Sequence, residues 1–72
     1  MKEVIVEGRV QGVGFRALCY EVAEKLGTNC TAENLDDGSV RITIPDDKSK
    51  QFIEELKKNK PPLALITKIM IK

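Results

Sequence analysis

The first third of the chain changes from an alternating pattern of apolar and polar residues to a helical one. Residues 2–10 alternate, with valines on one face and mostly charged side chains on the other, which predicts a half-buried strand. From Phe15 to Leu26, apolar residues recur every three or four positions, and Gly27 follows as a natural helix terminator. The pattern therefore predicts an amphipathic helix after the strand.

The middle of the chain predicts two short strands joined by a turn. Residues 28–34 indicate a weaker strand that places Cys30, Ala32 and Asn34 on one face. Residues 35–38 read Leu-Asp-Asp-Gly, which is typical of a hairpin turn because Asp-Gly tolerates a positive φ. Alternation over residues 40–44 predicts the second strand of this hairpin.

A second helix and a fourth strand follow. We expect Asp47 or Ser49 to cap the helix, and Pro61-Pro62 to end it because proline does not continue a helix. The expected buried stripe of this helix consists of Phe52, Ile53 and Leu56. Residues 64–72 predict a strand with apolar residues at both parities, so the pattern leaves its faces unassigned.

The predicted order of elements is strand, helix, strand, strand, helix, strand. Two such β-α-β units with right-handed crossovers pack both helices on one face of a four-stranded antiparallel sheet. The sequence thus predicts an α+β fold, the ferredoxin-like βαββαβ sandwich, with its other sheet face solvated. We expect residues 1–72 to be a single domain, because 72 residues are too few for two independent cores.

Composition argues against several classes of function. The 12 basic and 11 acidic residues leave a formal net charge of +1, which does not suit a broad nucleic-acid surface. One Tyr, two Phe and no Trp provide no platform for stacking bases. The chain shows neither an apolar run of bilayer length nor a signal peptide, so we expect no membrane partner and a cytoplasmic location.

The chain contains no His, which removes the usual general base near neutral pH and the commonest metal ligand. We therefore expect no metal site and no cofactor. Cys19 and Cys30 are interpreted as reduced apolar fillers, although their spacing leaves a disulfide open. Any chemistry has to come from Arg, Asn, carboxylates or backbone amides.

One segment stands out as a candidate site. Residues 8–14 contain three glycines, and the predicted helix begins directly after them. Backbone N–H groups of such a loop and of a helix N-terminus converge on one concavity, where the helix dipole favours an anion. Arg16 adds a planar fork of donors suited to phosphate oxygens. The alternative is a tight strand-to-helix turn with a solvated arginine.

The stretch Gly8–Arg16, GRVQGVGFR, resembles the first motif of the acylphosphatase family, and residues 34–40, NLDDGSV, resemble its second. The resemblance implies hydrolysis of a small acyl phosphate, with inorganic phosphate or sulfate as product or inhibitor. It implies that Arg16 binds the substrate phosphate and that Asn34 positions the attacking water. It also implies a phosphate cradle of backbone amides from Arg9, Val10, Gln11, Gly12, Val13 and Gly14.

A second resemblance gives an alternative function. Residues 61–66, PPLALI, are similar to the end of the acylphosphatase-like N-terminal domain of the hydrogenase-maturation carbamoyltransferase. In that case the chain is a non-catalytic module that binds phosphate or carbamoyl phosphate for a larger enzyme.

The chain departs from the family pattern in two places. Glu33 stands where family members commonly have Arg, and a carboxylate near an anion site weakens its field. Strand alternation nevertheless directs Glu33 away from the face that carries Asn34. Family enzymes usually have a further C-terminal strand beyond the position of Lys72, so we expect a monomer with an exposed sheet edge, or pairing at that edge.

Overall fold

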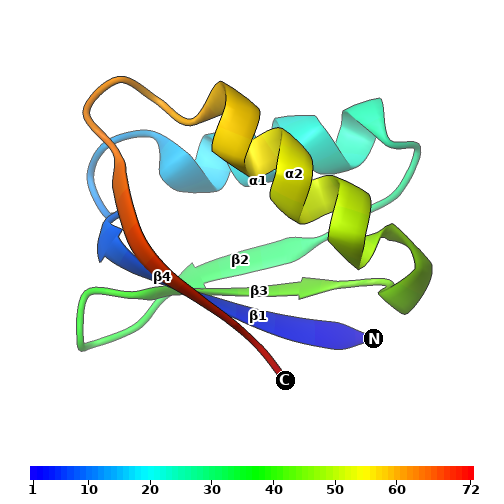
Figure 1. Ribbon diagram of the computed structural model, residues 1–72, viewed down its shortest axis with the longest axis horizontal. Coiled ribbons are helices and arrows are strands. Elements are labelled where there is room, and N and C mark those ends of the chain that lie inside the picture. Colours follow the sequence, from blue (N-terminus) through cyan, green and yellow to red (C-terminus); the bar gives the residue numbers. More distant parts are fainter.

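The computed structural model describes all 72 residues, and two helices cover one face of a sheet (Figure 1). The elements are β1 (Lys2–Arg9), α1 (Phe15–Lys25), β2 (Thr31–Asn34), β3 (Val40–Ile44), a 3₁₀ turn (Asp46–Lys48), α2 (Ser49–Asn59) and β4 (Leu65–Ile71). The strands form one antiparallel sheet in the order β2-β3-β1-β4. The predicted ferredoxin-like βαββαβ sandwich is confirmed.

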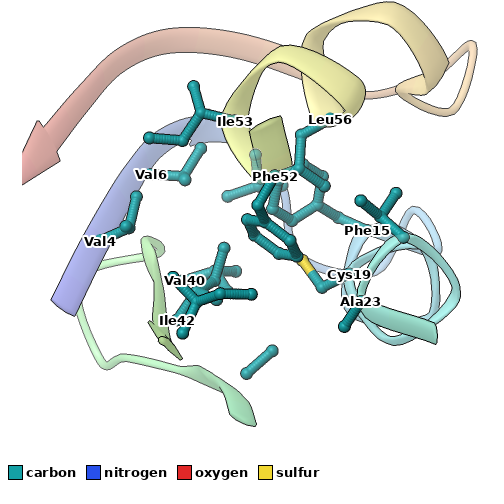
Figure 2. Close-up of a cluster of buried hydrophobic side chains, with 14 of the residues drawn as sticks. Val4, Val6, Phe15, Cys19, Ala23, Val40, Ile42, Phe52, Ile53 and Leu56 are labelled. Carbon is teal, nitrogen blue, oxygen red and sulfur yellow. The ribbon is translucent and has the colours of Figure 1, made fainter. Parts of the chain in front are cut away.

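The core between the helices and the sheet contains 15 buried side chains. Figure 2 shows Phe15 and Cys19 of α1 and Phe52 of α2 pointing toward one another. Phe15 is the first residue of α1 and is 1% exposed. Burying a Phe side chain contributes roughly 1.5–3 kcal/mol, so this residue fixes where α1 begins and hence where its free N–H groups point.

The second strand is shorter than predicted, because β2 starts at Thr31 rather than at Thr28. The amide of Thr28 still belongs to the end of α1, since it donates to the carbonyl of Ala23 at 2.9 Å. The register pairs Thr31 with Thr43, so continuing β2 would bring residue 29 opposite Pro45. Proline has no N–H to donate, and the ladder stops there.

The start of the second helix also differs from the prediction. No side chain caps α2, and its boundary residue Lys48 has φ −105° and ψ −9° instead of the extended conformation of an N-cap. The preceding 3₁₀ turn leads directly into the helix. The hydroxyl of Ser49 donates to the carbonyl of Asp46 at 2.9 Å, so the expected cap at Asp47 or Ser49 is wrong. The predicted buried stripe of Phe52, Ile53 and Leu56 is confirmed.

A β-bulge explains why the last strand has apolar residues at both parities. The β1–β4 register pairs Glu7 with Lys68 and then Gly8 with Ile66, which leaves Thr67 as the extra residue. Ile66 and Ile69 therefore both pack against the core although they lie three positions apart.

The bulge requires glycine at position 8. Gly8 has φ +129°, and a Cβ there would lie 2.0 Å from the carbonyl oxygen of Leu65. We expect Gly8→Ala to lower the free energy of unfolding by about 3 kcal/mol or more, the sum of backbone strain and overpacking. Gly38→Ala is the matched control, because Gly38 has φ +92° but open space at its Cβ position. That control should lose only about 1–2 kcal/mol in urea unfolding; equal losses would contradict the clash.

Tyr20 covers part of an edge of the sheet. β2 is an edge strand, and the Tyr20 hydroxyl both donates to the carbonyl of Ala32 and accepts from its N–H, at 3.2 Å each. These two backbone groups face away from β3, where a further strand would otherwise find them unpaired. The side chain of Tyr20 therefore hinders the pairing of another strand with this edge of the sheet.

Candidate active site

Three connections meet at one end of the molecule, on the left in Figure 1: the β1–α1 loop, the β2–β3 turn and the segment between α2 and β4. A depression of about 210 Å³ lies there. Its lining consists of Val10, Gly12, Gly14, Phe15, Arg16, Ala17 and Asn34. The structure thus brings together the two residues that the resemblance assigns to phosphate binding and to water positioning.

A larger depression of about 490 Å³ lies between the end of α1 and residues 28–30. Its only charged lining residue is Glu24, and no Arg or Lys faces it. An anion is repelled by that charge distribution. A third depression, of about 310 Å³, lies beside Leu18 and Lys25 and contains no residue of the glycine loop. Only the smallest depression gathers the glycine loop, Arg16 and Asn34, so it is the candidate site.

The loop and the first turn of α1 present free donors to the smallest depression. Gly12 and Gly14 have φ values of +72° and +83°, and neither has another atom within 4 Å of its Cβ position. The first intrahelical bond runs from Leu18 N–H to Gly14 O, so the N–H groups of residues 15–17 have no partner in the helix. The first turn has neither a capping side chain nor an acidic residue. These features together favour an anion at this point.

Arg16 and Asn34 reach the depression from different elements. Arg16 is exposed in the first turn of α1, and none of the four ion pairs of the chain uses it. Asn34 is the last residue of β2 and is exposed as well. Its side chain takes part in no hydrogen bond with the β2–β3 turn, which other groups hold in place. Both polar ends are therefore available to a substrate.

The other predicted cradle residues differ in their positions. Val10 lines the depression, but the whole residue is only 1% exposed, so it offers little surface to a ligand. Val13 packs against the core, and Arg9 ends β1 opposite Leu65. Neither Arg9 nor Val13 lines the depression, and neither does Gln11.

Gln11 has a structural contact that the sequence pattern did not reveal. Its side-chain amide donates to the carbonyl of Leu35 at 2.8 Å and to that of Ser39 at 2.9 Å. The side chain thus crosses from the β1–α1 loop to the turn that follows Asn34. The only signal in the sequence is a long polar side chain within an otherwise glycine and valine loop.

The β2–β3 turn is held by its own hydrogen bonds. Leu35 N–H donates to Ser39 O at 2.9 Å, and Gly38 N–H donates to Leu35 O at 3.1 Å. The Asp37 carboxylate accepts from the N–H and the hydroxyl of Ser39 at 2.9 and 2.6 Å. The hydroxyl bond, with the N–H bond second, lowers the pKa of Asp37 below its ordinary value. The turn is therefore locally rigid beside Asn34.

Glu33 lies on the sheet face away from the depression. The register places it opposite Arg41, whose guanidinium donates to the Glu33 carboxylate from Nε at 2.6 Å and from a terminal nitrogen. Strand alternation thus directs Glu33 away from Asn34, as the sequence predicted. Its charge is paired with Arg41, which limits the weakening of the anion field.

The remaining reactive groups do not form a second centre. Cys19 and Cys30 are free thiols, and burial raises the pKa of Cys19 to about 12 and also raises the pKa of Cys30. Cys19 is 0% exposed, which confirms its predicted place in the core. No group of three His, Cys, Asp or Glu side chains is arranged to hold a metal ion. The 11-residue helices are too short to cross a membrane.

A ferredoxin-like sandwich that gathers free helix N–H groups, a glycine loop and an arginine around one depression suits an anion such as phosphate. The family model described as Acylphosphatase matches residues 2–72. The chain belongs to the acylphosphatase family, and both resemblances found in the sequence are confirmed.

Individual relatives agree with this assignment. The chain is 44% identical over 68 residues to an acylphosphatase from Enterococcus faecalis, covering 92% of this chain and 75% of that protein. It is 39% identical over 67 residues to the carbamoyltransferase HypF of Synechocystis, covering 92% of this chain but 9% of that protein. The crystal structure of acylphosphatase from Bacillus subtilis superposes with a TM-score of 0.84 at 36% identity, covering 99% of this chain and 80% of that one.

Proposed function

We propose that this protein is an acylphosphatase that hydrolyses a small acyl phosphate to a carboxylate and inorganic phosphate. The observation that carries the proposal is the meeting of Arg16, Asn34 and the free N–H groups of the first turn of α1 around one depression. An acyl phosphate is an activated mixed anhydride whose carboxylate is a good leaving group. Its hydrolysis needs mainly positioning and charge stabilisation, which these groups supply.

In this mechanism the phosphoryl oxygens bind to the loop amides and to the Arg16 guanidinium, which stabilise charge in the transition state. Asn34 orients one water toward the phosphorus through its carbonyl and amide groups. Asn34 has no basic group at neutral pH, so the water proton passes to an oxygen of the substrate's own phosphate. The P–O bond to the carboxylate breaks, and inorganic phosphate and the carboxylate leave.

The alternative function is a non-catalytic module that binds phosphate or carbamoyl phosphate. The match to part of HypF favours it, because that enzyme carries a similar domain within a much longer chain. The higher identity to a free-standing acylphosphatase, 44% against 39%, supports the hydrolase instead. Both the hydrolase and the non-catalytic module are expected to bind phosphate, so only a measurement of turnover distinguishes them.

Two further properties belong to this proposal. We infer a monomer that does not pair at its β2 edge, because the Tyr20 hydroxyl occupies backbone groups there that strand pairing would use. We infer a reducing compartment, the cytoplasm, because Cys19 and Cys30 are free thiols.

The test is hydrolysis of a chromogenic acyl phosphate by the 72-residue chain, with a phosphate monoester as the matched control substrate. We expect turnover of the acyl phosphate only, with competitive inhibition by inorganic phosphate. In a phosphate titration, backbone amide shifts should appear first in residues 11–16. Phosphate binding without any hydrolysis would favour the module, and shifts confined to residues 57–60 would contradict the site itself.

A further inference from the structure

Gln11 connects the two parts of the candidate site. Its side chain leaves the β1–α1 loop and donates both amide hydrogens to the β2–β3 turn, to Leu35 O at 2.8 Å and Ser39 O at 2.9 Å. These residues lie 24 and 28 positions away in the sequence. No other hydrogen bond joins loop residues 10–14 to turn residues 35–39.

The two carbonyls that Gln11 contacts are the ones that close the turn. Leu35 O also accepts from Gly38 N–H at 3.1 Å, and Ser39 O also accepts from Leu35 N–H at 2.9 Å. Ser39 is 2% exposed, so water has little access there to replace the Gln11 donor. The turn is thus a rigid unit, and Gln11 fixes where that unit lies relative to the loop.

Asn34 directly precedes this unit, at the end of the four-residue edge strand β2. The loop and α1 hold the phosphate and the guanidinium of Arg16, whereas the water-orienting amide comes from the other side of the depression. The distance between these two sides has to be constant for a water to be aimed at phosphorus. Misplacement of a reacting group by about 1 Å costs on the order of 10²-fold in rate.

We propose that Gln11 is a positioning residue, whose side chain aligns Asn34 with the phosphate held by the loop and Arg16. The inference rests on the proposed function. Gln11 does not line the depression, so its side chain acts through the turn and not on the substrate. Its substitution changes only a side chain outside the depression, so the residues that line the depression keep their donors.

The test replaces Gln11 with Met, which is similar in length but has no N–H groups. We expect kcat to fall about 10- to 50-fold while the inhibition constant of inorganic phosphate changes less than about threefold, because alignment is lost and the cradle is kept. Ser49→Ala is the matched control. It also removes one side-chain donor to a backbone carbonyl, but at the start of α2, so kcat per folded molecule should not change.

A double-mutant cycle distinguishes positioning from a loss of stability. If Gln11 acts through Asn34, adding Gln11→Met to Asn34→Ala should lower kcat no further. Independent, multiplicative losses would overturn the inference, as would a Gln11→Met variant with wild-type kcat per folded molecule. Should Gln11→Met fail to fold, Gln11→Asn, which keeps the amide but is one carbon too short, takes its place in the same cycle. A wild type without turnover would defeat the proposed function, and the inference would fall with it.

Discussion

Replacing Arg16 with alanine is expected to lower kcat/KM for an acyl phosphate by about 10²- to 10³-fold, as loss of one preorganised charge-stabilising donor typically does. Arg16 is the only Arg or Lys that lines the depression. Free loop amides keep some affinity for phosphate, so the inhibition constant should rise as well, but by less than the loss in kcat/KM. Steady-state kinetics with phosphate as the inhibitor measures both quantities.

Arg41→Ala provides the matched control for Arg16→Ala. It removes the same charge from the sheet face away from the depression, where Arg41 is paired with Glu33. If only the net charge of the protein mattered, both variants would lose the same affinity for phosphate. We expect Arg41→Ala to stay within about twofold of the wild type at physiological salt, because Arg41 and the Glu33 carboxylate that the substitution leaves unpaired both lie on the solvated face away from the depression, where salt screens them. A folded Arg16→Ala variant with full kcat/KM would remove Arg16 from the mechanism.

Arg16→Lys adds a geometric test. Lysine restores the charge as a compact ammonium, whereas the guanidinium of Arg16 is a planar fork that matches two phosphate oxygens. We therefore expect Arg16→Lys to recover phosphate affinity better than kcat. Full recovery of kcat would show that charge alone is needed at this position.

Local patterns predicted most of the fold. The helical spacing from Phe15 and the stop at Gly27 match α1, which ends at Lys25. Gly27, just beyond it, has φ +73°, and its N–H donates to Glu24 O at 3.0 Å. The Asp-Gly turn lies where predicted, with Gly38 at φ +92°. These features depend on residues close in sequence, so their patterns are visible without the structure.

The features that sequence did not predict depend on contacts between distant residues. The bulge at Thr67 depends on the close approach of Gly8 to the backbone of Leu65. The pattern of apolar residues within β4 does not predict where such a bulge lies. The hydrogen bonds from the Gln11 side chain to the β2–β3 turn, and those of the Tyr20 hydroxyl to Ala32, each join residues at least 12 positions apart. A single sequence states which polar groups exist, but only the packing determines which carbonyl each one meets.

The candidate site shows the same division. Alternation of side chains along the strand predicted that Asn34 and Glu33 lie on opposite faces of the sheet, and the structure confirms this. Physical reasoning offered an anion site at the start of the helix that begins with Phe15, with a plain strand-to-helix turn as the alternative. The roles of Arg16 in binding and of Asn34 in positioning water came from the family resemblance, and they remain predictions for the experiments described.

Asn34→Ala is expected to lower kcat by at least about 10²-fold while phosphate affinity stays within about twofold of the wild type. The water loses its orienting group, but the anion is still held by Arg16 and the free N–H groups at the start of α1. The side chain of Asn34 is exposed and forms no hydrogen bond within the chain. Its removal should therefore change the free energy of unfolding by no more than about 0.5 kcal/mol.

Asn29→Ala is the control for this variant, because Asn29 is also exposed, lies just before the same strand and lines the depression of about 490 Å³ instead. It should keep wild-type kcat. A competing explanation is that Asn34 supports the β2–β3 turn, which would make the variant less stable but fully active per folded molecule. The turn is held instead by Gln11, Asp37 and Ser39, so we expect the opposite result. Unfolding curves, kcat and phosphate inhibition measured on the one variant decide between the two, because only the loss of water positioning lowers kcat without lowering stability.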